Sequence, residues 1–335
     1  MRITKTVLNR SRYLETEEPS KSLPASSEEF YDQGVINEDS GDRWFSSDIS
    51  KALRFYYRAY QSYRDSLKLD PTNPDALYNL PRLKFDVYNK YIKDDSIILT
   101  NLENCADALN DNDEGGFLGD IISICKSFDF SEKLLIESGQ QNSLGWDLYY
   151  NIALAYFELI EKSISEMSLP DQLNYESEIV CAILRCKSAF ITVLDKFLSA
   201  EREDTSLNDS TENLCEVVIE GYRMISCVYE VLFSQQLLDF MDTILAEFTL
   251  RLDNIANILS NQNLPHHLIV NLRISKLKER GARALGYDNF LNIWNSEEDL
   301  QNEIEKLLNE ASSTRSFIEK FDSVDLTIDS NLKWK

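Results

Sequence analysis

Apolar residues recur every three or four positions along most of the chain, which is the spacing that covers one face of an α-helix. The clearest stretch is 50–69, whose apolar face consists of Ala52, Leu53, Tyr56, Ala59, Tyr60, Tyr63 and Leu67. Capping signals precede two such stretches, because Ser26 stands three residues before Glu29 and Asn73 stands directly before Pro74. Nothing in the chain reads as a series of strands joined by hairpin dipeptides. The pattern therefore predicts an all-α protein.

The same periodicity predicts further helices over 171–200, 235–259 and 268–285. Weaker helical segments fill 117–140, after a polar loop at 109–116. We expect this middle part of the chain to pack irregularly.

Three features predict breaks or new starts. Pro81 lies inside the helical pattern that begins at Asn73, so we expect it to kink or restart that helix. The polar stretch 199–212 is predicted to be a charged loop. Asn295 stands three residues before Glu298 and is predicted to cap another helix.

Residues 37–80 resemble one tetratricopeptide (TPR) repeat. The likeness lies in the small and aromatic positions of two helices and in a closing proline: Gly41, Trp44, Ala52, Tyr56, Ala59 and Pro71. The turn between the two helices is one residue shorter than the family pattern, and the second helix runs about two turns longer. Similar spacings occur later in the chain, at Tyr149, Ile152, Ala153 and Tyr156, and at Tyr222, Ile225, Ser226 and Tyr229.

The resemblance implies an irregular TPR-like superhelix of stacked antiparallel helical hairpins, formed by residues 26–325 as one domain. Segment 1–25, rich in Ser, Pro and Glu near its end, is predicted to be disordered, and the tail 326–335 to fray. A stack of hairpins acts through a surface, so the implied function is protein binding without catalysis.

Charge narrows the class of partner. The chain carries 57 acidic and 34 basic residues, a formal net charge of -23. Direct nucleic-acid binding is disfavoured, because phosphate contacts need a basic surface. A Lys/Arg-rich protein is the natural complement. The acidity is equally explained by solubility alone.

Candidate chemistry is sparse. The six cysteines form no C-x-x-C pair and fall in apolar helical patterns, so we expect buried free thiols in a reducing compartment. The adjacent His266 and His267 are the histidines of the chain, and no nucleotide-binding, zinc-protease or serine-hydrolase motif occurs. We therefore predict no enzyme activity, no metal and no cofactor.

Localisation is less constrained. No run of apolar residues is long enough for a membrane span, so no membrane association is expected. The basic start, with Arg2, Lys5, Arg10 and Arg12, fits a mitochondrial presequence, a basic localisation patch or an ordinary terminus. We expect the cytoplasm or nucleus ahead of the mitochondrion.

Six residues are candidates for the binding surface. The acidic candidates, Glu38, Asp42 and Asp147, would suit a basic ligand and would repel an acidic peptide terminus, so a carboxylate clamp is disfavoured. The other three are Tyr57 and Tyr150, each beside a core tyrosine and expected to face a groove, and Asn151, at a clamp-like position.

The leading hypothesis is thus an adaptor or dedicated chaperone that holds a basic segment of a client such as a ribosomal protein or histone. The alternative is a structural subunit of a larger assembly, and a helical enzyme with an unrecognised site is a third reading. The sequence leaves the client and the oligomeric state open.

Overall fold

A computed structural model of the chain describes residues 24–93, 96–111, 116–140, 145–166, 172–200, 207–231, 235–284, 287–296 and 304–323. The segment predicted to be disordered, 1–25, lies outside these ranges up to residue 23, and so does the predicted frayed tail, 326–335. Within the described ranges the regular structure is helical and no strand occurs.

The helices are, in order, α1 (Ser27–Phe45), α2 (Ile49–Leu69), α3 (Pro74–Tyr91), the 3-10 turn η2 (Leu99–Asn101), α4 (Ala106–Leu109), α5 (Ile121–Glu137), α6 (Trp146–Glu166), α7 (Gln172–Ala200), α8 (Leu207–Val231), α9 (Gln235–Leu259), α10 (His266–Ala282), α11 (Tyr287–Asn295) and α12 (Ile304–Ser323).

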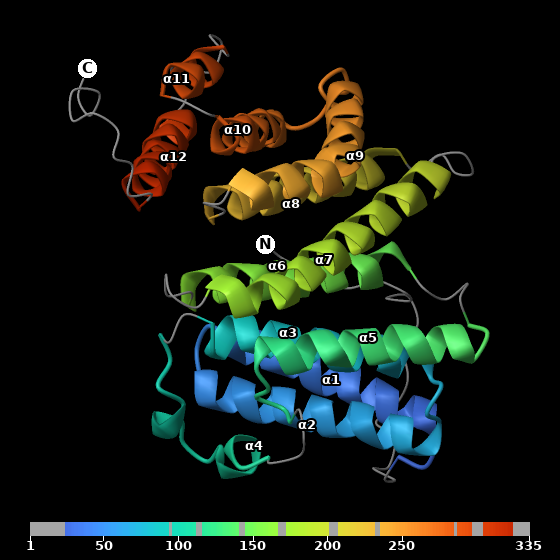
Figure 1. Ribbon diagram of the computed structural model, residues 1–335. Coiled ribbons are helices and arrows are strands. Elements are labelled where there is room, and N and C mark those ends of the chain that lie inside the picture. Colours follow the sequence, from blue (N-terminus) through green and yellow to red (C-terminus); the bar gives the residue numbers. More distant parts are fainter. Residues whose placement is uncertain are drawn as a thin grey trace.

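Figure 1 shows the helices stacked in layers, with α1 to α5 at one end, α6 and α7 in the middle, and α8 to α12 at the other end. Helix α1 packs along α2, and α6 packs along α7. This arrangement confirms the predicted all-α stack of helical hairpins. The third hairpin differs from expectation, because α8 lies closest to α10 and contacts the following helix, α9, less extensively.

Side-chain caps fix where several helices begin. Ser26 accepts a hydrogen bond from the backbone N–H of Glu29 at the start of α1, which confirms the predicted capping signal. Asn73 caps α3 in the same way, and Pro74 occupies its first turn. Asp48 and Asp120 cap α2 and α5.

Glycines allow α1 to lie close against α2. A Cβ atom on Gly34 would lie 2.4 Å from the Tyr63 ring, and one on Gly41 would lie 2.5 Å from the Tyr56 ring. The small position predicted at Gly41 is therefore a true helix contact. Trp44, predicted to be the aromatic position of the same helix, makes no such helix contact. Its side chain is exposed, and the ammonium group of Lys51 lies over its ring.

Three expectations about the helix pattern are wrong. Helix α3 runs through Pro81 without restarting, and the segment 117–140 contains one regular helix, α5, over Ile121–Glu137. Residues 207–212 open helix α8 and do not extend the charged loop. Tertiary burial of apolar side chains outweighs local breaking signals at these positions. Asn295 ends helix α11, and residues 297–303, where the predicted helix would begin, lie outside the described ranges.

One apolar core extends through most of the stack. It joins buried side chains from α3, α5, α6, α7, α8, α9 and α10. A second cluster lies around α2 and Phe117, and a third connects α10 to α11 and α12. Cys105, Cys125, Cys186 and Cys215 are buried as expected, whereas Cys181 is exposed.

Candidate protein-binding surface

Pairs of tyrosines seven residues apart occur on three helices. Seven residues span two helical turns, so both rings of a pair lie on one face. The pairs are Tyr56 and Tyr63 on α2, Tyr149 and Tyr156 on α6, and Tyr222 and Tyr229 on α8. Two of these pairs, on α6 and α8, coincide with the spacings noted in the sequence for the first helix of a hairpin, whereas the pair on α2 lies on a second helix.

Five of these tyrosines donate a hydrogen bond to a carboxylate on a neighbouring helix. The bonds are Tyr63 to Glu38 at 2.9 Å, Tyr56 to Asp42 at 2.7 Å, Tyr156 to Asp129, Tyr222 to Asp253 at 2.7 Å, and Tyr229 to Asp242 at 2.5 Å.

Each of these carboxylates also forms an ion pair with a Lys or Arg side chain. The pairs are Arg82 with Glu38 at 2.6 Å, Lys90 with Asp42 at 3.0 Å, Arg185 with Asp129 at 2.9 Å, Lys276 with Asp253 at 2.9 Å, and Arg283 with Asp242 at 3.3 Å. We call each set a triad. The tyrosine and the carboxylate come from two helices, and the cation comes from a third helix or, at Arg283, from the residue that caps it.

The triad around Glu38 is the most deeply buried. Glu38 is 2% exposed and Arg82 is 7% exposed. Burial lowers the pKa of Arg82, but the Glu38 carboxylate outweighs that effect and the pKa is raised overall. Burial and the same carboxylate raise the pKa of Tyr63. Both groups therefore keep their protons, and the triad is a charge-paired structural contact.

The two acidic candidates on α1 have different surroundings. Both oxygens of Glu38 accept hydrogen bonds from Arg82, so this carboxylate offers no surface to a guest, contrary to expectation. Asp42 also belongs to a triad, but its side chain is about one-third exposed. Asp42 therefore remains accessible at the outer end of the contact between α1 and α3.

The candidates on α6 are mostly buried. Asn151 is 0% exposed and its side-chain N–H group donates to Tyr78 of α3 at 3.1 Å. Tyr150 is 7% exposed and its ring lies beside Trp146, so the expected groove-facing position is wrong. Asp147 is half-buried. An inward-facing α6 is the physical reason, because other helices cover it on several sides.

Tyr57 lies apart from the other five candidates. Its ring stacks on Tyr60 and contacts Phe117, with centroids 6.1 and 5.3 Å away. The side chain is half-buried against the cluster around α2. Tyr57 is thus largely occupied by intramolecular contacts.

Charged side chains follow a row of helices in which α1 pairs with α3, α3 contacts α6 and α6 contacts α8, and we call this group the seam cluster. Its carboxylates are Asp42, Asp86, Glu158, Glu161 and Glu220, and its cations are Lys90, Lys93 and Arg223. Lys90 joins Asp42 to Asp86, and Lys93 contacts both Glu158 and Glu161. Carboxylates outnumber cations among these described residues.

Two members of the seam cluster are electrostatically strained. Burial raises the pKa of Glu161, and the neighbouring Glu158 raises it further while Lys93 opposes the change. Burial likewise raises the pKa of Glu220, with Glu161 and Glu216 adding to the effect and Arg223 opposing it. An additional cation near these two carboxylates would favour their charged forms.

Sequence reasoning missed most of the seam cluster. Lys93, Glu158 and Glu161 carry no motif, and their helices are not adjacent in the chain. Helix α10 is the most basic segment of the sequence, and this composition by itself would suggest an exposed basic surface. Lys276 of α10 and Arg283, which follows it, form ion pairs with carboxylates of α9. These two cations therefore make intramolecular contacts.

The arrangement nearest to a nucleophilic site is Lys84 beside Ser127. Burial lowers the pKa of Lys84 to about 8, and its Nζ donates to Ser127 Oγ at 3.3 Å. Ser127 in turn donates its hydroxyl proton to the carbonyl of Ser123 at 2.8 Å. That bond is a helix-surface contact, so the hydroxyl does not point toward a substrate space.

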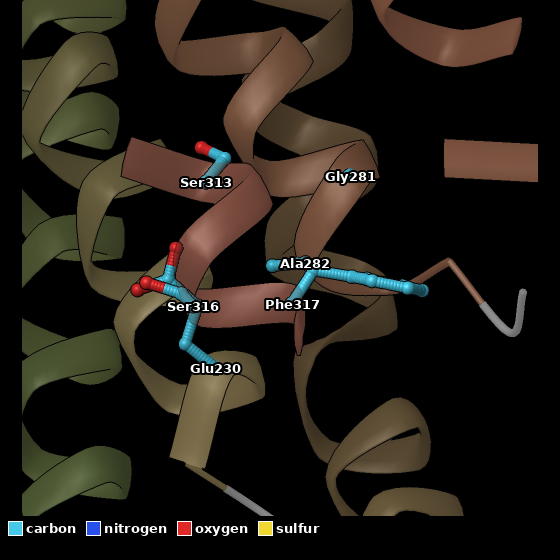
Figure 2. A pocket seen from close by; sticks show the side chains of 6 residues that line it. All are labelled: Glu230, Gly281, Ala282, Ser313, Ser316 and Phe317. Atoms are coloured by element: carbon cyan, nitrogen blue, oxygen red, sulfur yellow. The ribbon is translucent and has the colours of Figure 1, made fainter. Parts of the chain in front are cut away.

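Figure 2 shows a small cavity between α8, α10 and α12, lined by Glu230, Gly281, Ala282, Ser313, Ser316 and Phe317. Its volume of about 10 Å³ suits a single water molecule at most. The described residues contain no group of three metal-ligating side chains. None of the described helices has the length and apolar content to cross a bilayer.

Comparison with known proteins gives one informative match. The chain is 30% identical over 138 residues to the uncharacterized protein YNL193W of Saccharomyces cerevisiae (strain ATCC 204508 / S288c). The matched segment makes up 40% of this chain and 24% of that protein. The match thus spans about a quarter of the yeast protein. No family model matches the chain, and no solved structure matches it.

Proposed function

We propose that the chain is a non-enzymatic adaptor or dedicated chaperone that holds a Lys/Arg-rich segment of another protein. The observation that supports this function is the seam cluster, in which five carboxylates meet three cations along four helices. The resemblance to TPR proteins, whose stacked helices form an extended surface for a ligand, supports the same interpretation. A cytoplasmic or nuclear client of basic composition is the partner class we propose.

Relief of repulsion would provide the binding energy. Glu161 and Glu220 are close to each other and to further carboxylates, and both have raised pKa values. The Glu161 side chain is 38% exposed, so a guest ammonium or guanidinium group beside it replaces repulsion by attraction in a partly dehydrated setting, whereas Glu220 is 7% exposed and acts on the guest without direct contact. Such charge-assisted contacts contribute on the order of 1.5–3 kcal/mol each.

The length of the guest follows from helix spacing. Packed helices lie about 8–10 Å apart, so four neighbouring helices span roughly 27 Å between their axes. An extended chain advances about 3.3 Å per residue, so about eight residues would cross the surface. We therefore expect a short basic stretch and not a single basic residue to bind.

A labelled peptide of alternating Lys, Arg and Ser residues tests the proposal. Fluorescence anisotropy with the full chain should show binding that weakens roughly tenfold or more between low and physiological salt. The double variant Glu161→Gln, Glu220→Gln should weaken binding by a similar factor. The matched control is Glu247→Gln on α9, whose carboxylate is exposed and far from the seam cluster in sequence.

Two results would contradict the proposal. One is a peptide affinity that does not change with ionic strength. The other is equal loss of affinity in the seam variant and in Glu247→Gln, because general acidity would then explain the binding.

The pH dependence of guest binding has a definite sign. Glu161 and Glu220 have raised pKa values, so they become neutral at a higher pH than ordinary glutamates. Peptide affinity should therefore begin to fall at a higher pH than the range in which ordinary glutamates are protonated. The Glu161→Gln, Glu220→Gln variant should lose this early fall, as a titration by anisotropy would report.

Exposed apolar side chains favour the alternative, a structural subunit of a larger assembly. Phe130 on α5 and Leu250 and Ile258 on α9 are each more than half exposed. Apolar groups of this size often mark contact surfaces when they are contiguous. This function predicts that the isolated chain aggregates, and a stable species in size-exclusion chromatography would count against it.

A further inference from the structure

The outward face of α5 carries an apolar stripe with two lysines. Phe130 is 59% exposed, Ile122 is 47% exposed and Ile136 is 42% exposed. Lys126 and Lys133 lie between them at helical spacing, so all five residues lie within one face. Phe130 is the most exposed of the aromatic side chains in the described part of the chain.

The opposite face of α5 is firmly anchored. Cys125 and Phe128 are buried in the main core. Along the flank of α5 that meets α7, Asp129 and Glu132 both accept hydrogen bonds from Arg185. The stripe is therefore held on a fixed helix, and its exposure is not the result of an unattached segment.

The charge of this stripe differs from that of the molecule. The chain carries a formal net charge of -23, whereas the outward face of α5 carries Lys126 and Lys133 against Asp129 and Glu137 and is locally neutral. Two copies of the chain repel each other at most surfaces, but they can approach here without local repulsion. At physiological ionic strength the remaining repulsion is screened beyond about 8 Å.

We propose that two copies of the chain associate by packing α5 against α5 in antiparallel orientation. With the two-fold axis between residues 131 and 132, Lys126 lies opposite Glu137 of the second copy. Phe130 then lies opposite Lys133 of the second copy, and the two-fold repeats both contacts. The two Phe130 rings are offset by about 4.5 Å along the helix direction, close enough to pack together.

The stripe is self-complementary in this register. Within one copy Glu137 is 3.8 Å from Lys133, a loose contact that leaves the carboxylate able to accept a second cation. In this register Ile122 lies opposite a position beyond the end of α5, so the apolar part of the interface is limited to Phe130 and Ile136 of each copy, which is below the usual size of a permanent dimer. The association is therefore reversible, with a dissociation constant in about the micromolar range or weaker.

Sedimentation velocity of the full chain over a roughly hundredfold concentration range tests the dimer. The wild type should shift from monomer to dimer with increasing concentration. Phe130→Ser and Lys126→Glu should each raise the dissociation constant at least about tenfold, which corresponds to about 1.4 kcal/mol. The double variant Lys126→Glu, Glu137→Lys should recover most of the affinity, because it exchanges the two charges within the same pair.

Two matched controls separate this interface from general effects. Lys68→Glu changes the net charge equally at an exposed lysine of α2, and Phe240→Ser removes an exposed phenylalanine of α9. Both should dimerise like the wild type, and circular dichroism checks that every variant is folded. A monomer at all concentrations overturns the proposal, as does a dimer that is unaffected by Phe130→Ser and Lys126→Glu. Failure of the double variant to recover would reject the stated register.

Discussion

Glu38 and Asp42 stand one helical turn apart on α1, and both accept a hydrogen bond from a tyrosine of α2 and an ion pair from α3. Glu38 is enclosed by the hairpin, whereas Asp42 reaches its outer end. The same chemical group is therefore a structural contact at one position and an accessible charge at the next. Burial, which depends on three helices, makes the difference.

Loss of the buried cation should be costly. Arg82→Met leaves Glu38 charged and unpaired in the interior, so we expect it to lower the free energy of unfolding by about 3–5 kcal/mol. Urea unfolding followed by circular dichroism measures the change. Lys68→Met, at an exposed pair with Asp65, is the control and should cost less than about 0.5 kcal/mol. Equal effects of the two variants would contradict a buried pair at Arg82.

Lys84 should give stability a recognisable pH dependence. Burial lowers its pKa to about 8 in the folded chain, below the ordinary value of 10.5. The unfolded chain then binds more protons between these two values, so this residue makes the fold more stable as the pH rises from about 8 to 10. Relative to Lys84→Met, the wild type should gain on the order of 2 kcal/mol over that interval. A constant difference between the two proteins would show that Lys84 is not desolvated.

At the scale of elements, the triads connect helices that apolar contacts alone would leave free to slide. A tyrosine, a carboxylate and a cation meet at a single place, so each triad fixes the relative position of three chain segments. Triads occur in the first layer, around α5 to α7, and around α8 to α10. The third set explains why α8 is joined to α10 as well as to α9. Helix α10 brings the cation that the α9 carboxylate needs.

Close approach of α1 to α2 should fail when a methyl group is added. Gly34→Ala places a Cβ atom 2.4 Å from the Tyr63 ring, so the ring or the helix must move. We expect a loss of about 1–3 kcal/mol despite the better helix propensity of alanine. Gln33→Ala, at an exposed neighbour on the same helix, should be neutral or slightly stabilising in the same thermal unfolding measurement. An unchanged midpoint for Gly34→Ala would show that the helices are further apart than described.

At the scale of the whole molecule, acidity and compactness oppose each other. A net charge of -23 creates repulsion that is spread over the surface, while the triads and the core oppose it locally. The seam cluster and the α5 stripe are the two places where this balance is uneven. The seam cluster has fewer cations than carboxylates, and the outward face of α5 is locally neutral on a strongly acidic molecule.

Added salt should therefore stabilise the fold. Screening weakens the general repulsion more than it weakens the buried ion pairs, which are shielded from solvent. Raising sodium chloride from about 20 to 300 mM should increase Tm by roughly 2–4 °C, measured by differential scanning fluorimetry. A decrease in Tm would show that exposed ion pairs dominate, and potassium chloride in place of sodium chloride would check that the effect is one of ionic strength.

The sequence by itself determined the features that depend on near neighbours. The helical periodicity, the caps at Ser26 and Asn73, and the close contact at Gly41 all follow from residues within a few turns. The all-α stack follows from these features, because each apolar face must be covered by another helix. Helix boundaries over 235–259 were predicted correctly for the same reason.

Which polar residues are exposed depends on the packing of helices that are distant in the chain. Glu38 is buried because Arg82 reaches it from 44 positions away, and Asn151 is buried because Tyr78 of α3 lies against it. The seam cluster likewise combines charges from helices that are distant in the chain. Hydrophobic periodicity records which face of a helix is covered, but not which helix covers it. Burial of a charge depends on that neighbour, so the candidate surface could not be read from local sequence alone.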